Sequence, residues 1–135
     1  MKKPRTLALL VVIAHWLIAI WHLFVAAEVL PGPNNHVTWL AITLISCGHL
    51  CVVIALLSRL SDKLAGLIAL IFFLAALSAD LYEHFLHASP NNVFMVATSA
   101  WSAWFHISVA ALLTLEIAAC LLGILLLSGG RTLLS

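Results

Sequence analysis

The sequence predicts an all-α integral membrane protein that folds as one four-helix bundle. Hydrophobic residues make up 64% of its 135 residues and charged residues only 8%, whereas a soluble domain carries about 25% charged residues. The mean hydropathy is +1.18. Four apolar stretches are each long enough to cross a bilayer, which takes about 20 helical residues. We therefore predict a single transmembrane domain over residues 1–135, with spans at about 6–29, 37–57, 64–87 and 94–127.

Each span is separated from the next by a short polar or turn-forming segment. The first span has a basic start, but its apolar run is longer than a cleaved signal peptide needs, so we expect it to be retained as a helix. The second, third and fourth spans follow Pro-Gly-Pro-Asn-Asn, Ser-Arg-Leu-Ser-Asp-Lys and Ser-Pro-Asn-Asn. Connections this short make consecutive helices antiparallel neighbours.

A short sequence pattern recurs in the two halves of the chain. Pro-Asn-Asn occurs at 33–35 and again at 90–92, and sixteen residues after each of these prolines lies a histidine, His49 or His106. Pro-Asn-Asn is also ordinary turn chemistry. The recurring pattern predicts that each half forms a hairpin of two antiparallel helices. The two hairpins would have the same orientation in the membrane, as a parallel repeat about an axis along the membrane normal. The pattern also predicts that His49 and His106 lie at equal depth, with His15 near the same level.

The basic residues predict the orientation of the bundle. They lie before the first span, between the second and third, and after the fourth, whereas the segments 30–36 and 88–93 contain none. By the positive-inside rule both termini are cytoplasmic, and we expect a bacterial inner (plasma) membrane location. The six basic residues are Lys2, Lys3, Arg5, Arg59, Lys63 and Arg131.

Ionisable side chains inside these spans mark the candidate site. Each costs about 2.5–3.5 kcal/mol to insert, so an intramembrane acid or histidine indicates function. Asp80, His84 and His87 follow one another at i, i+4 and i+7, which places them on one helical face, and His15 and His22 are two turns apart. Lipid cannot satisfy such groups, so these faces are expected to point into the bundle.

Imidazoles and carboxylates that converge from several helices are typical ligands of copper, zinc or iron. We predict a transition-metal site in the extracytoplasmic half. Its ligands would be His22, Asp80, His84 and His106, with Glu28, Glu83 and His87 as secondary candidates. The Asp-x-x-x-His spacing at 80–84 resembles a ligand motif in one subunit of the copper membrane monooxygenases. The predicted function is a redox or metal-handling subunit of a larger membrane complex or homo-oligomer.

Two other classes of function remain open at this stage. A small cytochrome b would hold haem b between His49 and His106, with His15 nearby, and would pass electrons between quinone and a periplasmic redox protein. The extracytoplasmic half, however, has no Lys or Arg to pair with haem propionates. A cofactor-free accessory subunit would use its polar residues only to pair helices. Membership of an oxidoreductase or oxygenase stays undecided, and no nucleic-acid partner is expected.

Four further residues are predicted to be structural. Glu116 lies toward the inner end of the predicted fourth span and is expected to snorkel or pair helices; a proton relay with Asp80 is its alternative role. Three free cysteines are expected to pack as small apolar residues rather than to form disulfides. They are Cys47, Cys51 and Cys120.

Overall fold

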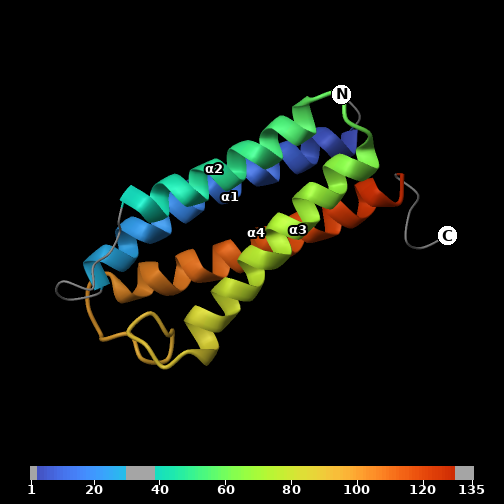
Figure 1. The fold of residues 1–135 in the computed structure, drawn as a ribbon. Helices are drawn as coiled ribbons and strands as arrows, with labels where there is room; N and C mark the ends of the chain where they lie inside the picture. The colour runs from blue at the N-terminus through green and yellow to red at the C-terminus, as the bar shows by residue number, and fades with distance from the viewer. Residues whose placement is uncertain (1–2, 30–38, 130–135) are drawn as a thin grey trace.

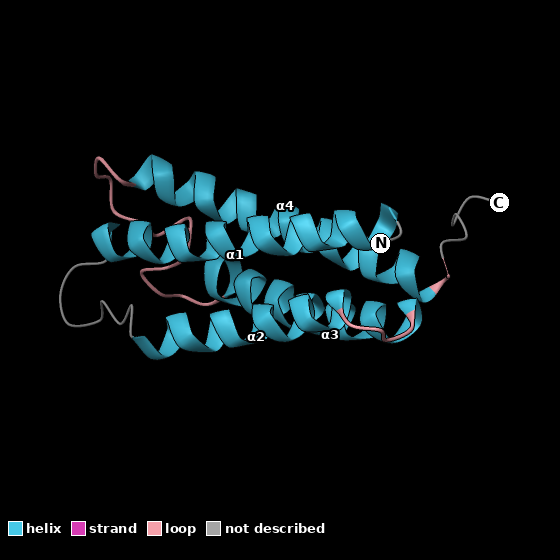
Figure 2. Ribbon diagram, turned by 90° about the horizontal axis from the view of Figure 1, so that it is seen from above, coloured by secondary structure: helices cyan, strands magenta, loops and turns pink. Residues whose placement is uncertain are grey.

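The computed structural model describes residues 3–29 and 39–129, and the regular structure in these ranges is entirely helical. Successive α-helices run in opposite directions and lie alongside one another (Figure 1 and Figure 2). The start of the first, the connection between the second and third, and the end of the fourth lie at the same end (Figure 1). The predicted helical bundle is confirmed. Its elements are α1 (Lys3–Val29), α2 (Trp39–Leu57), α3 (Asp62–Leu81), a π-helical turn η1 (Tyr82–Leu86) and α4 (Ser102–Leu127).

Three of these helical segments are long and apolar enough to cross a bilayer: α1, α3 together with η1, and α4. Large apolar side chains point away from the bundle along each of them, for example Leu10, Ile71 and Leu121. Such an apolar surface is stable in lipid. The backbone is stable there as well, because each helix satisfies its own N–H and C=O groups. α2 is described over 19 residues. The chain before it, including the start of the predicted 37–57 span, lies outside the described residues.

One end of the bundle is tied together by Arg5. Its guanidinium donates to the carbonyl oxygens of Leu56 at 3.2 Å and Ser58 at 3.0 Å, and to that of Leu60. It also forms an ion pair of 2.7 Å with Asp62. Leu56 lies in the last turn of α2, where backbone oxygens lack helical partners, Ser58 and Leu60 lie in the connection after it, and Asp62 opens α3. Arg5 therefore joins the start of α1 to the α2–α3 connection.

α3 and α4 cross in backbone contact at Gly66 and Gly123. A Cβ atom on Gly66 would lie 2.7 Å from the carbonyl oxygen of Gly123, and one on Gly123 would lie 3.1 Å from the carbonyl oxygen of Gly66. Small residues at a crossing let two membrane helices approach closely. The interface of α3 with α4 is the largest in the bundle, and that of α1 with α4 is next.

Two apolar clusters fill the bundle, and the polar side chains lie between them. Phe73 and Leu56 are the largest members of the first cluster, and Phe105 is the largest of the second. Four buried histidines and Glu116 occupy the zone between, so this zone is where the interior is polar. The first cluster comprises Ala8, Val12, Val52, Leu56, Ala65, Ala69, Phe73, Ala119, Cys120 and Leu126, and the second Val25, Ala26, Val29, Phe105 and Val109.

The fourth helix differs from its predicted bounds. It begins at Ser102 rather than at residue 94, and the preceding residues form a folded loop. The Asn92 side chain holds this loop: its Nδ2 donates to the His87 carbonyl, and its Oδ1 accepts from the Phe94 amide, both at 3.0 Å. The second Pro-Asn-Asn motif therefore builds a loop and does not open a helix. The first motif lies outside the described residues, so the predicted repeat stays untested.

Candidate functional site

A cavity of about 490 Å³ lies between the helices and receives side chains from all four of them. His15 and His49 line this cavity together with the predicted ligands His22, Asp80 and His84, whereas His106 does not line it. Small residues of α3, Ala75, Ala76 and Ala79, leave the space open on one side. The ionisable residues that line it are His15, His22, His49, Asp80, Glu83, His84 and Glu116.

His22 and His84 form an outer pair in this cavity. Both are buried, with 7% and 5% of their surface exposed, and their ring centroids lie 4.9 Å apart at an interplanar angle of 82°. His22 comes from the C-terminal half of α1, and His84 comes from the π-helical turn η1. The predicted proximity of these two histidines is therefore present in the fold.

The hydrogen bonds of this pair assign the position of each ring proton. Ser108 Oγ donates to the Phe105 carbonyl at 2.8 Å, so the same oxygen accepts from His22 Nδ1 at 2.8 Å. The Asn91 carbonyl can only accept, so His84 Nδ1 donates to it at 2.9 Å. In a neutral imidazole whose Nδ1 carries the proton, Nε2 keeps its lone pair. Neither Nε2 has a partner among the described residues.

The π-helical turn sets the direction of His84. The His87 amide donates to the Tyr82 carbonyl at 2.7 Å, five residues earlier, which is the π-helical spacing. Such turns occur mostly as single insertions inside α-helices and often lie at functional sites. Here His84 turns into the bundle. Glu83 also borders the cavity, but nearly half of its side chain is exposed, and it pairs with the equally exposed His87 at 3.2 Å.

A second group of buried residues links the remaining helices. His49 Nδ1 donates to the Ile45 carbonyl at 2.7 Å, so its Nε2 accepts from His15 Nδ1, also at 2.7 Å. His15 Nε2 lies 3.2 Å from Glu116 Oε1, and these two side chains are 5% and 1% exposed. We call His49, His15 and Glu116 the inner chain. Both ring nitrogens of each of its histidines already bond to protein.

Asp80 joins the inner chain to the outer pair. Its carboxyl lies within hydrogen-bond reach of Glu116 and interacts electrostatically with His84 and His15. Glu116 Oε2 is buried, and no described group donates a hydrogen bond to it. An ionised Asp80 cannot do so, because a carboxylate only accepts. A single proton on either acid would complete a hydrogen bond between them. Asp80 thus interacts both with His84 of the outer pair and with the acid of the inner chain.

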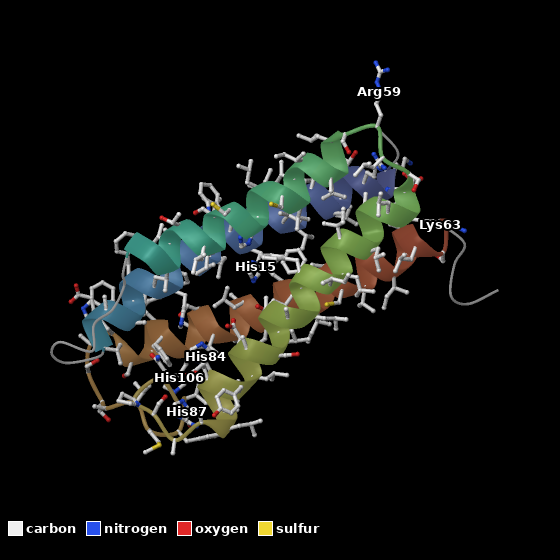
Figure 3. The ribbon with its side chains drawn as sticks, viewed as in Figure 1. His15, Arg59, Lys63, His84, His87 and His106 are labelled. Atoms are coloured by element: carbon white, nitrogen blue, oxygen red, sulfur yellow. The ribbon has the colours of Figure 1, made fainter. Side chains whose placement is uncertain are left out.

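Two further predicted candidates, His106 and Glu28, lie apart from this arrangement. His106 is exposed on the first turn of α4, where its Nδ1 faces the Ser102 carbonyl at 2.6 Å and its Nε2 the Val93 carbonyl at 2.9 Å. It does not reach the level of His49, because the late start of α4 removes the helical turns assumed between Pro90 and His106. His15 lies mid-bundle, whereas His84, His87 and His106 lie away from Arg59 and Lys63 (Figure 3). Glu28 is exposed near the end of α1.

No group of three or more His, Cys, Asp or Glu side chains within the described residues is already arranged to hold a metal ion. His22 and His84 supply two free nitrogens, and Asp80 supplies a carboxylate that faces Glu116. The arrangement can therefore offer two imidazoles and one carboxylate to a metal ion. Asp80 would have to turn away from Glu116 to bind it.

Sequence reasoning left Glu116 out of the predicted ligand set and missed Ser108 altogether. Glu116 is fully buried, so it does not snorkel, and its contact with His15 pairs α4 with α1. It is the sole acid of the predicted fourth span, which was itself a signal of function. Ser108 is also fully buried, and only its contact with His22 reveals its role. Serine is common in membrane helices, so the sequence carries no comparable signal for it.

Comparisons of the chain with models of known protein families, with curated proteins and with solved structures find no match. The function is therefore inferred from the side chains of the cavity.

Proposed function

We propose that this protein binds one transition-metal ion in the cavity of its bundle through His22, His84 and Asp80. The observation that carries the proposal is the state of the two outer imidazoles. In each, Nδ1 is held by an oxygen of the protein, and Nε2 keeps a free lone pair inside the same cavity. Histidine ligands of metals almost always donate their other ring N–H in this way, which fixes the tautomer and the orientation.

The third ligand is assigned to Asp80. It lies four residues before His84 and already interacts with that ring. Two imidazoles and one carboxylate suit zinc, copper or iron. For zinc, the metal–nitrogen distance is about 2.0–2.1 Å. We leave His106 out of the ligand set, because both of its nitrogens face backbone carbonyls. The same reasoning disfavours haem at His49 and His106, since both ring nitrogens of His49 bond to protein and both of those of His106 face backbone carbonyls.

The proposed orientation places this site toward the extracytoplasmic side. Lys3, Arg5, Arg59 and Lys63 lie at the end of the bundle where α1 begins, and the η1 turn lies at the other. The positive-inside rule makes the basic end cytoplasmic. In a bacterial inner membrane the protein would act as a metal-handling or redox subunit, with a further membrane protein or a second copy as its partner.

The test is metal content in purified protein. His22→Ala, His84→Ala and Asp80→Ala are each expected to lose near-stoichiometric copper, zinc or iron, measured by elemental analysis, while the protein remains in the membrane fraction. His87→Ala is the matched control, because His87 lies on the same turn but pairs with Glu83 outside. Full metal content in both His22→Ala and His84→Ala would reject the site. A Soret band would support the haem alternative, and neither signal would support an accessory subunit.

Ser108 provides a sharper form of the same test. Ser108→Ala removes the acceptor that fixes His22 Nδ1, without touching a proposed ligand. Loss of such a partner typically costs 10- to 100-fold in metal affinity. Ser78→Ala is the control, because Ser78 bonds only to the Leu74 carbonyl of its own helix and is exposed. Equal affinity in the two variants would contradict the assigned role of the His22 tautomer.

A further inference from the structure

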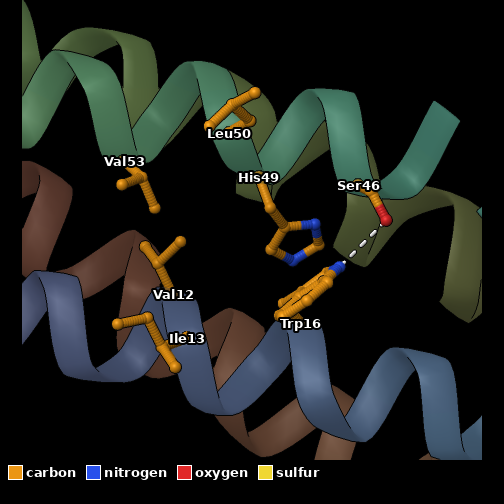
Figure 4. A pocket seen from close by; sticks show the side chains of 7 residues that line it. All are labelled: Val12, Ile13, Trp16, Ser46, His49, Leu50 and Val53. Carbon is orange, nitrogen blue, oxygen red and sulfur yellow. Dashed lines mark hydrogen bonds between the residues drawn. The ribbon is translucent and has the colours of Figure 1, made fainter. Parts of the chain in front are cut away.

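A second pocket opens on the lipid-facing side of α1 and α2, apart from the proposed metal ligands. Its volume is about 340 Å³, within the range of small-molecule sites. Figure 4 shows Trp16, Ser46 and His49 at one end and Val12 and Val53 toward the other. The surface of the pocket is almost wholly apolar, and the few polar groups that border it lie at the Trp16 end, which we call the polar end.

The polar end has an unused hydrogen-bond donor. Trp16 Nε1 donates to Ser46 Oγ at 3.0 Å, which uses this oxygen as an acceptor. Ser78, Ser108 and Thr114 donate their hydroxyls back to carbonyls of their own helices at 2.7–2.8 Å. The Ser46 hydroxyl has no such acceptor among the described residues. An occupant that offers an acceptor at this point would complete its hydrogen bonding.

The position of the polar end near the middle of the membrane limits which molecules can occupy the pocket. Trp16 is the middle residue of α1, which places it about 20 Å of helix from either end at 1.5 Å per residue. The polar groups of a phospholipid lie outside a hydrocarbon core about 30 Å thick, so they remain about 15 Å from its centre. An acyl chain could fill the pocket, but it has no acceptor for Ser46. The occupant needs a small ring with an acceptor that resides within the hydrocarbon.

We propose that this pocket binds the ring of a membrane quinone. One quinone carbonyl accepts from the Ser46 hydroxyl, the ring lies against the indole of Trp16, and the isoprenoid tail lies along Val12 and Val53. His49 forms the inner wall of the pocket and is the first member of the inner chain, which continues through His15 to Glu116. The proposal concerns binding alone and does not depend on the metal site, so protein stripped of metal is expected to bind quinone equally.

The test uses decylubiquinone and the purified protein in lipid nanodiscs. Saturable quenching of tryptophan emission is expected, and the part due to this pocket is the difference from a Trp16→Phe variant. Ser46→Ala removes one hydrogen bond and is expected to weaken binding about three- to tenfold. Val53→Phe fills the apolar end and is expected to abolish the saturable component. Ile54→Phe, which points to lipid on the same helix, is the matched control and should bind normally.

Two results would overturn the proposal. Quenching that rises linearly with quinone and is the same in Ser46→Ala and Val53→Phe would show partition into the bilayer only. Retention of a phospholipid acyl chain by mass spectrometry, without saturable quinone binding, would show that lipid is the occupant.

Discussion

The four buried histidines share one feature at the level of single atoms: each is held at Nδ1. They differ at Nε2, which bonds to protein in His15 and His49 and is free in His22 and His84. The first two are therefore used to join helices, and the last two remain available to a ligand. This division cannot be seen from residue type or spacing, since all four are histidines of apolar helices.

Glu116 tests how the inner chain contributes to stability. Glu116→Ala leaves His15 Nε2 without a partner in a buried environment, which costs about 1–3 kcal/mol. Glu116→Gln provides an amide that can donate to or accept from the same nitrogen, so this variant is expected to stay near the wild-type stability. The measurement is thermal or SDS-induced unfolding in detergent. If the glutamine variant is as unstable as the alanine variant, the negative charge of Glu116, and not its hydrogen bond, holds His15.

Spacing along a helix predicted part of the site correctly and misplaced the rest. His22, Asp80 and His84 line one cavity, as expected from their helical faces. The depth counts failed on α4, because they assumed a helix from residue 94. With α4 beginning at Ser102, Glu116 is its fifteenth of 26 residues and sits mid-helix, whereas His106 lies on the first turn.

At the level of the elements, the crossing of α3 and α4 depends on two glycines. A methyl group at Gly66 would meet the backbone of Gly123, which cannot yield as a side chain can. Gly66→Ala is therefore expected to destabilise the protein by about 1–3 kcal/mol despite the better helix propensity of alanine. Unfolding in detergent measures the change. Gly48→Ala is the comparison, because there the methyl meets the ring of Phe72, which can rotate; equal losses would contradict a backbone crossing.

The π-helical turn and the folded loop after it could not be predicted from the sequence. Val93 to Val96 is an apolar run that resembles a helix start, yet Phe94 is 81% exposed in the loop. The loop is fixed by the Asn92 side chain and by the Asn91 carbonyl that accepts from His84. These are tertiary contacts between a loop and a helix end, and no local pattern encodes them.

At the level of the whole molecule, composition was sufficient to predict the number and order of the helices but not how they pack. The number of helices and their antiparallel order follow from apolar length and short connections. The helices are apolar on all sides, so the apolar pattern does not distinguish a buried face from a lipid-facing face. Ionisable residues carried most of the information on which face points inward.

The orientation of the bundle can be checked with single cysteines. In a background with Cys47, Cys51 and Cys120 changed to serine, Ala88→Cys is expected to react with a membrane-impermeant maleimide added to spheroplasts. Leu60→Cys, in the loop at the basic end, is expected to react only after the membrane is opened. The reverse pattern would place the η1 end in the cytoplasm and contradict the positive-inside prediction.

Arg5 has a consequence for the order in which the chain assembles. Its carbonyl partners follow it by 51 to 55 residues, so it is synthesised before they are. The first hairpin alone provides the Leu56 and Ser58 oxygens, but the carboxylate that neutralises the guanidinium belongs to Asp62, at the start of the second hairpin. The ion pair that joins the start of α1 to α3 can therefore form only after translation has passed Asp62.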